Sequence, residues 1–460
     1  MFDLALLPLV LGSAVEGMLL KVLVQLVVII AAARLFAALF RKIGQPRVVG
    51  EIAAGLLLGP SALGWAFPEF SDMLFRTYDG PAPSWLAYLG IGQEFFRTDV
   101  SAVFYLLAQL GLVFLLFLIG LEFDFSHIRR NRSAAGLISF TGIALPFAMG
   151  FILGRWMHPT FAEQVPGALG FALFMGTAMS ITAIPILGRI MMEFNITRTR
   201  LGAITITAAA IDDACGWILL AAVSALVQAS FSGWHTARMF GLAAGYALLL
   251  IFVLRPLLLR WTRRVAPTPD TDISLNALAV IMIAIFLSSM ITSLIGIFAI
   301  FGAFLLGAAV SSDEAFREAF SRKVAHFINA FFLPIFFTYT GLRTDIGSLS
   351  SPLLWSMAAL VCGVAIFGKL VGCSVAARVS GMSRRESVGV GAMMNTRGLM
   401  ELIVINVGHD LGVIPREVYC MLVIMALLTT VMASPFVLWL LKRDPELRPL
   451  FEASPFRRDR

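Results

Sequence analysis

Residues 208–221 read AAAIDDACGWILLA and place two adjacent carboxylates, Asp212 and Asp213, near the middle of a long apolar run. The run extends over residues 201–228, contains no other charged residue and is long enough to cross a bilayer as a helix. An ionised aspartate at mid-membrane costs about 3 kcal/mol even on the lenient insertion scale, and two neighbouring carboxylates also repel each other. A pair this unfavourable indicates a site that handles a cation or a proton.

The composition of the chain identifies its broad class. Hydrophobic residues make up 59% of the 460 residues and charged residues only 14%, whereas a soluble globular protein carries about 25% charged residues. The net charge of +7 comes from short loops between apolar runs, where positive residues set membrane orientation, so no nucleic-acid partner is expected. Five scattered histidines provide no nucleophile–base constellation, and the four cysteines lack metal-site spacing, so we expect neither an enzyme nor a cofactor.

The pattern of apolar runs predicts an all-α polytopic membrane protein with about thirteen transmembrane helices, each of about 20 mainly apolar residues. The predicted spans are residues 18–41, 47–66, 101–122, 133–157, 166–192, 200–230, 236–262, 273–293, 295–311, 323–342, 352–380, 385–411 and 416–441. Positive residues concentrate in every second loop, which places the N-terminus outside and the C-terminus in the cytoplasm. The expected domains are a transmembrane domain over residues 1–445 and a short basic cytoplasmic tail over residues 446–460.

Three further charged residues lie deep inside predicted spans: Lys369, Arg397 and Glu401. Together with the two aspartates they would cost on the order of 15 kcal/mol if left unpaired, so they must pair or line a wet cavity. Asp212 with Lys369 is the obvious neutralising pair, and Arg397 with Glu401 lies at i, i+4 on one helix face. Asp213 remains without a partner and is therefore best placed to bind something. The alternative is that all five only hold helices in register, although buried pairs do little for stability alone.

Two predicted spans contain residues that interrupt a helix. Residues 179–185 read MSITAIP, and Pro185 removes a backbone donor and clashes with the preceding turn. The other interruption is the polar patch Asn395, Thr396 and Arg397, which ends in a glycine. Broken backbone at membrane depth is tolerated only where it is buried in protein or faces a cavity. If the units begin at the second and ninth spans, each break occupies the fourth position of a five-span unit, which is typical of the substrate site in an inverted-repeat transporter.

At these residues the sequence resembles the second large family of monovalent cation/proton antiporters, which includes bacterial sodium/proton antiporters, potassium-efflux systems and plant cation/proton exchangers. The resemblance covers nearly the whole chain, and besides the aspartate run it rests on GEIAAGLLLGPSALG (50–64), FLLFLIGLEFD (114–124), SITAIPILG (180–188), PIFFTYTGLRTDIG (334–347), IFGKLVG (366–372) and NTRGLMELIVINVG (395–408).

The resemblance implies two inverted five-helix repeats with crossed discontinuous helices, a mobile core and a scaffold domain that forms a homodimer. It implies that Asp213 carries the alkali cation or the proton, and that Asp212 is its partner, bridged to Lys369. Thr182 and Ser180 would supply oxygen ligands at the first break. The implied location is the plasma membrane, which is the inner membrane in a bacterium.

We therefore expect a secondary active antiporter in which Na⁺, K⁺ or Li⁺ and protons compete at the aspartate pair in an elevator-type cycle. Hard oxygen ligands suit these ions, and no His/Cys cluster favours a transition metal. Two alternatives are a potassium-efflux channel-like system and an organic-anion/sodium symporter of related fold. A channel would need a filter of repeated carbonyl or acidic rings, which the sequence does not show. The symporter would not need the Asp–Asp–Lys set.

Overall fold

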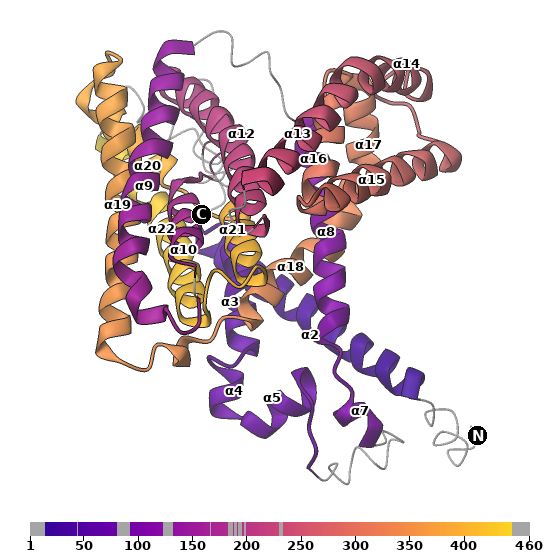
Figure 1. The fold of residues 1–460 in the computed structure, drawn as a ribbon, viewed down its shortest axis with the longest axis vertical. Coiled ribbons are helices and arrows are strands. Elements are labelled where there is room, and N and C mark those ends of the chain that lie inside the picture. The colour runs from indigo at the N-terminus through magenta and orange to yellow at the C-terminus, as the bar shows by residue number, and fades with distance from the viewer. Residues whose placement is uncertain are drawn as a thin grey trace.

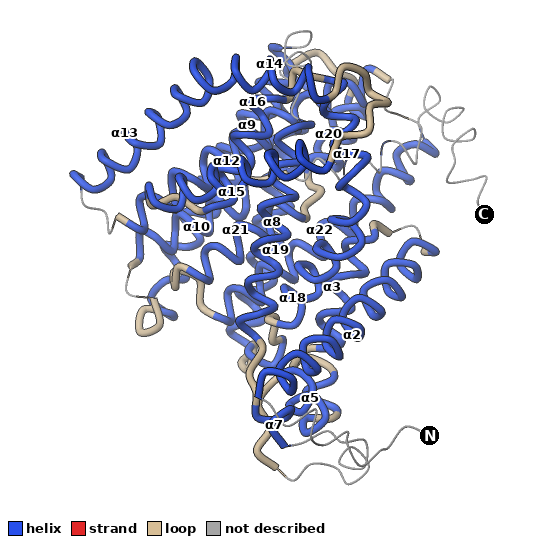
Figure 2. The backbone as a smooth tube through the Cα atoms, turned by 90° about the vertical axis from the view of Figure 1, so that its right-hand side faces the viewer, coloured by secondary structure: helices blue, strands red, loops and turns tan. Residues whose placement is uncertain are grey.

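The computed structural model describes residues 14–43, 45–80, 93–122, 132–165, 167–182, 199–229 and 233–443, together with Leu187, Met191 and Ile196. Throughout these residues the regular structure is helical, without a strand (Figure 2). The predicted tail lies outside them, as does Pro185.

The elements of the described chain are mostly long helices. In order they are α2 (Ala14–Lys42), α3 (Arg47–Leu58), α4 (Leu63–Ala66), α5 (Pro68–Phe75), α7 (Gln93–Arg97), α8 (Ser101–Glu122), α9 (Arg132–Phe161), α10 (Ala168–Ser180), α12 (Arg200–Gln228), α13 (Gly233–Leu249), α14 (Arg255–Val265), α15 (Leu275–Ile295), α16 (Ala299–Val310), α17 (Glu314–Phe327), α18 (Leu333–Leu342), α19 (Pro352–Val379), α20 (Arg384–Met394), α21 (Leu399–Asp410) and α22 (Arg416–Arg443). Short π-helical turns join α13 to α14 and α17 to α18.

The number of membrane-crossing helices is ten by length and apolar composition within the described residues, or eleven if the bent pair α20–α21 counts as one span. An all-helical polytopic membrane protein is thereby confirmed. This count of spans is lower than the predicted thirteen, because α10 and α16 contain only 13 and 12 residues and are too short to be counted. At 1.5 Å per residue each extends about 20 Å or less, short of the roughly 30 Å hydrocarbon core.

The helices pack in two groups, and in Figure 1 α9, α19 and α20 of one group lie at the left while α15, α16 and α17 of the other lie at the right. The first group contains α9, α10, α12 and α19 to α22, in which α9 packs on both α10 and α19. The second group contains α2, α3, α8 and α15 to α18, in which α18 packs on α3 and α8 packs on α16. The groups also touch, since α22 contacts α3. Both aspartates of the predicted site lie on α12, within the first group.

The contact between α8 and α16 in the second group requires glycine on both helices. A Cβ atom added to Gly120 would lie 2.3 Å from the carbonyl oxygen of Phe304, and one on Gly307 would lie 2.3 Å from that of Phe117. Small residues let membrane helices approach until their backbones touch, and this packing supplies association energy where the hydrophobic effect is absent. The two helices are therefore joined backbone to backbone.

Candidate functional site

The helix α12 carries Asp212 and Asp213 near its midpoint. The helix begins after Thr199, whose hydroxyl accepts a hydrogen bond from the backbone N–H of Gly202 at 3.0 Å and so caps the N-terminus. Asp212 is fully buried and Asp213 is 4% exposed. Since consecutive residues of an α-helix point about 100° apart, the two carboxylates face different surroundings.

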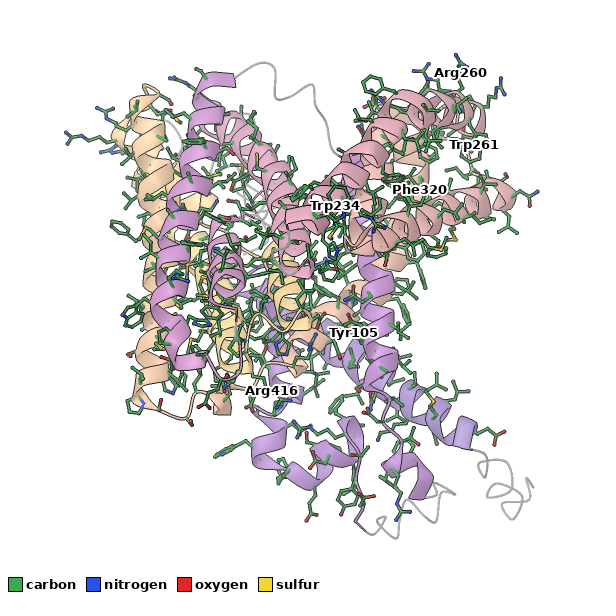
Figure 3. All side chains as sticks on the ribbon, in the orientation of Figure 1. Tyr105, Trp234, Arg260, Trp261, Phe320 and Arg416 are labelled. Atoms are coloured by element: carbon green, nitrogen blue, oxygen red, sulfur yellow. The ribbon has the colours of Figure 1, made fainter. Side chains whose placement is uncertain are left out.

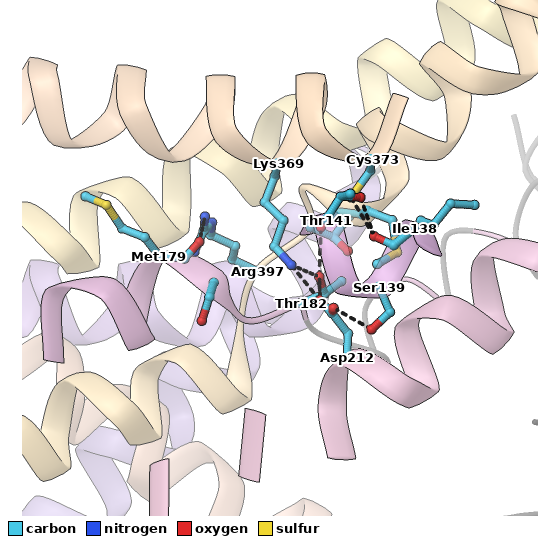
Figure 4. A network of polar contacts seen from close by, with 12 residues as sticks. Ile138, Ser139, Thr141, Met179, Thr182, Asp212, Lys369, Cys373 and Arg397 are labelled. Atoms are coloured by element: carbon cyan, nitrogen blue, oxygen red, sulfur yellow. Dashed lines mark hydrogen bonds and ion pairs between the residues drawn. The ribbon is translucent and has the colours of Figure 1, made fainter. Parts of the chain in front are cut away.

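Asp212 is surrounded by donors from three other segments (Figure 4). Its Oδ2 atom accepts hydrogen bonds from Nζ of Lys369 on α19 at 2.5 Å and from Oγ1 of Thr182 at 2.6 Å. Its Oδ1 atom accepts a hydrogen bond from the hydroxyl of Ser139 on α9 at 3.1 Å. Lys369 is also fully buried and donates to Thr182 at 2.7 Å. The structure therefore contains the Asp212–Lys369 ion pair, with hydroxyl groups filling the remaining positions around the carboxylate.

Asp213 has no such neutralising partner. Within the described part of the chain it makes no ion pair, although it is buried beside the fully paired Asp212. The indole of Trp217, one turn further along α12, approaches Asp213, yet its N–H group makes no hydrogen bond of ordinary geometry. Asp213 is thus a buried carboxylate that retains the capacity to take a cation or a proton.

The backbone break between α20 and α21 is hydrogen-bonded to the end of α10. The two helices meet at 42° across residues 395–398. Arg397 lies in this break, is fully buried and donates to the carbonyl oxygens of Ala178 and Met179 at 2.8 and 2.7 Å. Those carbonyls belong to the last turn of α10, where a helix leaves its oxygens without intrahelical partners. Glu401 lies 3.3 Å from the same guanidinium group.

The other sequence-predicted residues at the breaks direct their polar groups elsewhere. The hydroxyl of Ser180 donates to the carbonyl oxygen of Thr177 at 2.9 Å, and the hydroxyl of Thr396 donates to the carbonyl oxygen of Met393 at 2.9 Å. Asn395 is 1% exposed, and its side-chain oxygen is buried without a hydrogen-bond partner. Of the predicted oxygen ligands, only Thr182 contacts Asp212 in this structure.

Ser139 contacts the site but was not identified from the sequence. It is one of several hydroxyl residues in α9, which also include Ser133 and Thr141, and no spacing distinguishes it from other serines in membrane helices. Cys373 is a similar case, since its buried thiol lies on α19 one turn beyond Lys369, and its sulfur is 3.8 Å from the carbonyl oxygen of Ile138. Only the packing of α9 against α19 brings these groups to the aspartate.

Comparisons with known proteins agree with this architecture. The chain is 37% identical over 424 residues to the Na(+)/H(+) antiporter NhaS4 of Synechocystis sp., covering 91% of this chain and 97% of that protein. It is 34% identical over 432 residues to cation/H(+) antiporter 20 of Arabidopsis thaliana, covering 91% of this chain and 48% of the relative. The chain therefore spans about half the length of the plant protein.

A solved structure shows the same fold. The sodium proton antiporter MjNhaP1 from Methanocaldococcus jannaschii superposes with a TM-score of 0.60 at 13% sequence identity, covering 94% of this chain and 99% of that one. A family model described as "Sodium/hydrogen exchanger, transmembrane" matches residues 26–443. This is a transporter family rather than an enzyme family, and it confirms the resemblance seen in the sequence motifs. The chain therefore belongs to the transmembrane sodium/hydrogen exchanger family.

Proposed function

We propose that this protein is a monovalent cation/proton antiporter that exchanges Na⁺ or K⁺ for protons at Asp213. The observation that carries the proposal is the difference between the two neighbouring carboxylates. Asp212 is neutralised by Lys369 at 2.5 Å, whereas Asp213 is buried without a basic partner in the described residues. The relatives described as Na(+)/H(+) and cation/H(+) antiporters support the same class of transport.

The proposed mechanism is competition for one carboxylate. An ionised, empty Asp213 in the membrane interior is unfavourable by about 3 kcal/mol or more, and either an alkali cation or a proton removes that charge. The two cannot neutralise the same carboxylate together, so the helices carrying it move across the membrane with one or the other. Cation and proton are exchanged because each crossing of the membrane carries only one of them.

Hard oxygen atoms around Asp213 would complete the cation site. We assign this role to Thr182 and Ser180 at the end of α10, as the family resemblance implies. Thr182 already contacts Asp212, so it lies beside the carboxylate pair. Na⁺, K⁺ and Li⁺ all prefer such ligands, and their relative rates are a matter for measurement.

We further propose that α10 and the α20–α21 pair are the crossed discontinuous helices of two inverted five-helix repeats within a fold of thirteen spans. The bend of 42° at residues 395–398 and the hydrogen bonds from Arg397 to the end of α10 support this arrangement. The first helix group would be the mobile core of an elevator, and the second group the scaffold through which two copies dimerise in the plasma membrane. The alternation of loop charges supports an external N-terminus and a cytoplasmic C-terminus.

The pairing of Lys369 with Asp212 suggests how many protons move. If Lys369 releases its proton when Asp212 helps to bind the cation, two protons move for each cation and transport is electrogenic. Exchange rates measured at several imposed membrane potentials test this step. A rate that does not change with potential would establish one-for-one exchange instead.

The experiment that tests the proposed function uses purified protein in vesicles that contain a pH-sensitive dye. Addition of Na⁺, K⁺ or Li⁺ should move protons with wild-type protein, and Asp213→Asn should abolish the signal while the variant remains folded. Asp272→Asn is the matched control, because Asp272 is an exposed surface residue paired with Lys323. Exchange at the wild-type rate in Asp213→Asn would refute the assignment. Cation flux without proton movement would favour the channel-like alternative.

A further inference from the structure

A cavity of about 350 Å³ is lined by residues of α2, α3, α5, α8 and α18 and the segments next to them, and by Arg416, the first residue of α22. Three arginines line it, Arg76, Arg343 and Arg416, together with polar groups of Gln25, Ser71 and Ser101, and its described lining contains no carboxylate. This lining differs from that of the aspartate site, which lies on α12 and does not border the cavity. A basic cavity of this kind in a cation exchanger calls for a separate explanation.

The guanidinium group of Arg343 is only partly used by the protein. It donates to Oδ1 of Asp410 at 2.8 Å and to Oδ1 of Asn406 at 3.3 Å, and its face lies within 6 Å of the Tyr339 and Tyr419 rings. A guanidinium group has five N–H donors, so Arg343 retains donors after these contacts. Its side chain is 22% exposed, which leaves it open to the cavity.

Arg76 also lines the cavity, and its backbone carbonyl contacts a buried lysine. Its guanidinium group is 3.7 Å from Asp72, and both side chains are exposed, so this pair is weak. Lys21 is fully buried and donates to the carbonyl oxygens of Arg76 and Thr98 at 2.5 and 2.8 Å. The nearby Asp99 attracts Lys21, and the N–H and hydroxyl groups of Ser101 lower the pKa of Asp99. Arg76 and Lys21 are thus each balanced by one carboxylate.

Arg416 has no carboxylate partner among the described residues. Its side chain is exposed and makes neither an ion pair nor a hydrogen bond with the described residues, and it lies at the end of α22 that faces α4 and α5 (Figure 3). Because α22 begins at Arg416, the unpaired N–H groups and positive end of the helix dipole lie at the same place. The neighbouring Glu417 accepts a hydrogen bond from Gln164 and is not part of the cavity lining. One positive charge therefore remains in surplus at this cavity.

We propose that the cavity binds a phosphate group, either as inorganic phosphate or as the headgroup of an anionic phospholipid. Arg416 supplies the uncompensated charge, and the free donors of Arg343 and Arg76 supply the planar, bidentate hydrogen bonds that guanidinium groups form with oxyanions. Arg416 belongs to α22 of the first helix group, whereas Arg343 directly follows α18 of the second group and Arg76 directly follows α5. A bound phosphate group therefore links the two groups and stabilises their present arrangement.

The test measures the unfolding temperature of the purified protein in detergent as phosphate is added. Potassium concentration and ionic strength are held constant with potassium chloride, because the transported cation also binds. Phosphate should raise the unfolding temperature of wild type and of Arg155→Ala, whose arginine is exposed on α9 outside the cavity. The apparent affinity for phosphate should fall about tenfold or more in Arg416→Gln, as expected for loss of a charged contact.

A second arm replaces phosphate by phosphatidylglycerol, with phosphatidylcholine as its uncharged comparison. Stabilisation by phosphatidylglycerol that Arg416→Gln removes, and that inorganic phosphate weakens by competition, identifies the lipid headgroup as the ligand. Stabilisation by inorganic phosphate alone identifies the free ion. Equal responses of wild type and Arg416→Gln to both probes would overturn the proposal. If Arg416→Gln does not fold, Arg76→Ala provides the same comparison. Since the readout is binding, failure here leaves the proposed exchange at Asp213 unaffected.

Discussion

Replacing Lys369 by methionine should strongly destabilise the protein. Methionine has a similar length and can fill the same buried space, so the main change is loss of the ammonium group 2.5 Å from Asp212. The carboxylate would keep the hydroxyl donors of Thr182 and Ser139 but would have no counter-charge. Breaking a buried ion pair by removing one partner typically costs 3–5 kcal/mol.

Burial makes this loss large, because Asp212 and Lys369 are both fully inaccessible to water. Water therefore cannot solvate the carboxylate that the substitution leaves without a counter-charge.

Reversible unfolding of the purified variant in mixed detergent measures this difference. The double variant Asp212→Asn with Lys369→Met removes both charges and should recover most of the lost stability. Lys323→Met is the surface control, since Lys323 pairs with the exposed Asp272 and should cost about 1 kcal/mol or less. A loss in Lys369→Met no larger than the loss in Lys323→Met would refute the role assigned to the ion pair.

Two further substitutions test the packing and the site. Gly120→Val should lower the free energy of unfolding by about 1–3 kcal/mol or more, because the new side chain would meet the Phe304 carbonyl. Gly136→Ala is the control, since no atom lies within 4 Å of the added Cβ, and it should leave the unfolding temperature unchanged or raise it. Similar effects of the two substitutions would contradict the close contact of α8 with α16. Thr182→Val should raise the cation KM of exchange in vesicles more than Ser180→Ala does, because the Ser180 hydroxyl is bonded within its own helix. A larger effect at Ser180 would contradict the greater role expected for Thr182.

The charged part of the site could be predicted from the sequence because the membrane leaves few choices. A buried lysine and two buried aspartates in apolar runs must find one another or water, and Asp212 and Lys369 are in contact. Likewise, the polar patch that begins at Asn395 was a sufficient reason to expect a break, and the helices bend there by 42°.

Other parts of the site depend on packing that sequence patterns do not encode. Glu401 was the only partner foreseen for Arg397, yet the guanidinium group also holds two carbonyls of α10, a helix distant in sequence. Ser139 reaches Asp212 only because α9 crosses α12 and α19 at that level. The span count differed for a related reason, since an apolar run does not reveal where its helix ends, and α10 ends at Ser180.

The contact of Arg397 with α10 limits how ion preference can be changed by engineering. The last carbonyl oxygens of a helix are natural ligands for a bare cation, but here the guanidinium group already holds those of Ala178 and Met179. Side-chain oxygens must then discriminate between ions, with little help from the main chain. Substituting a shorter, uncharged residue at this position would free two main-chain oxygens, so a variant library aimed at larger ions should include it.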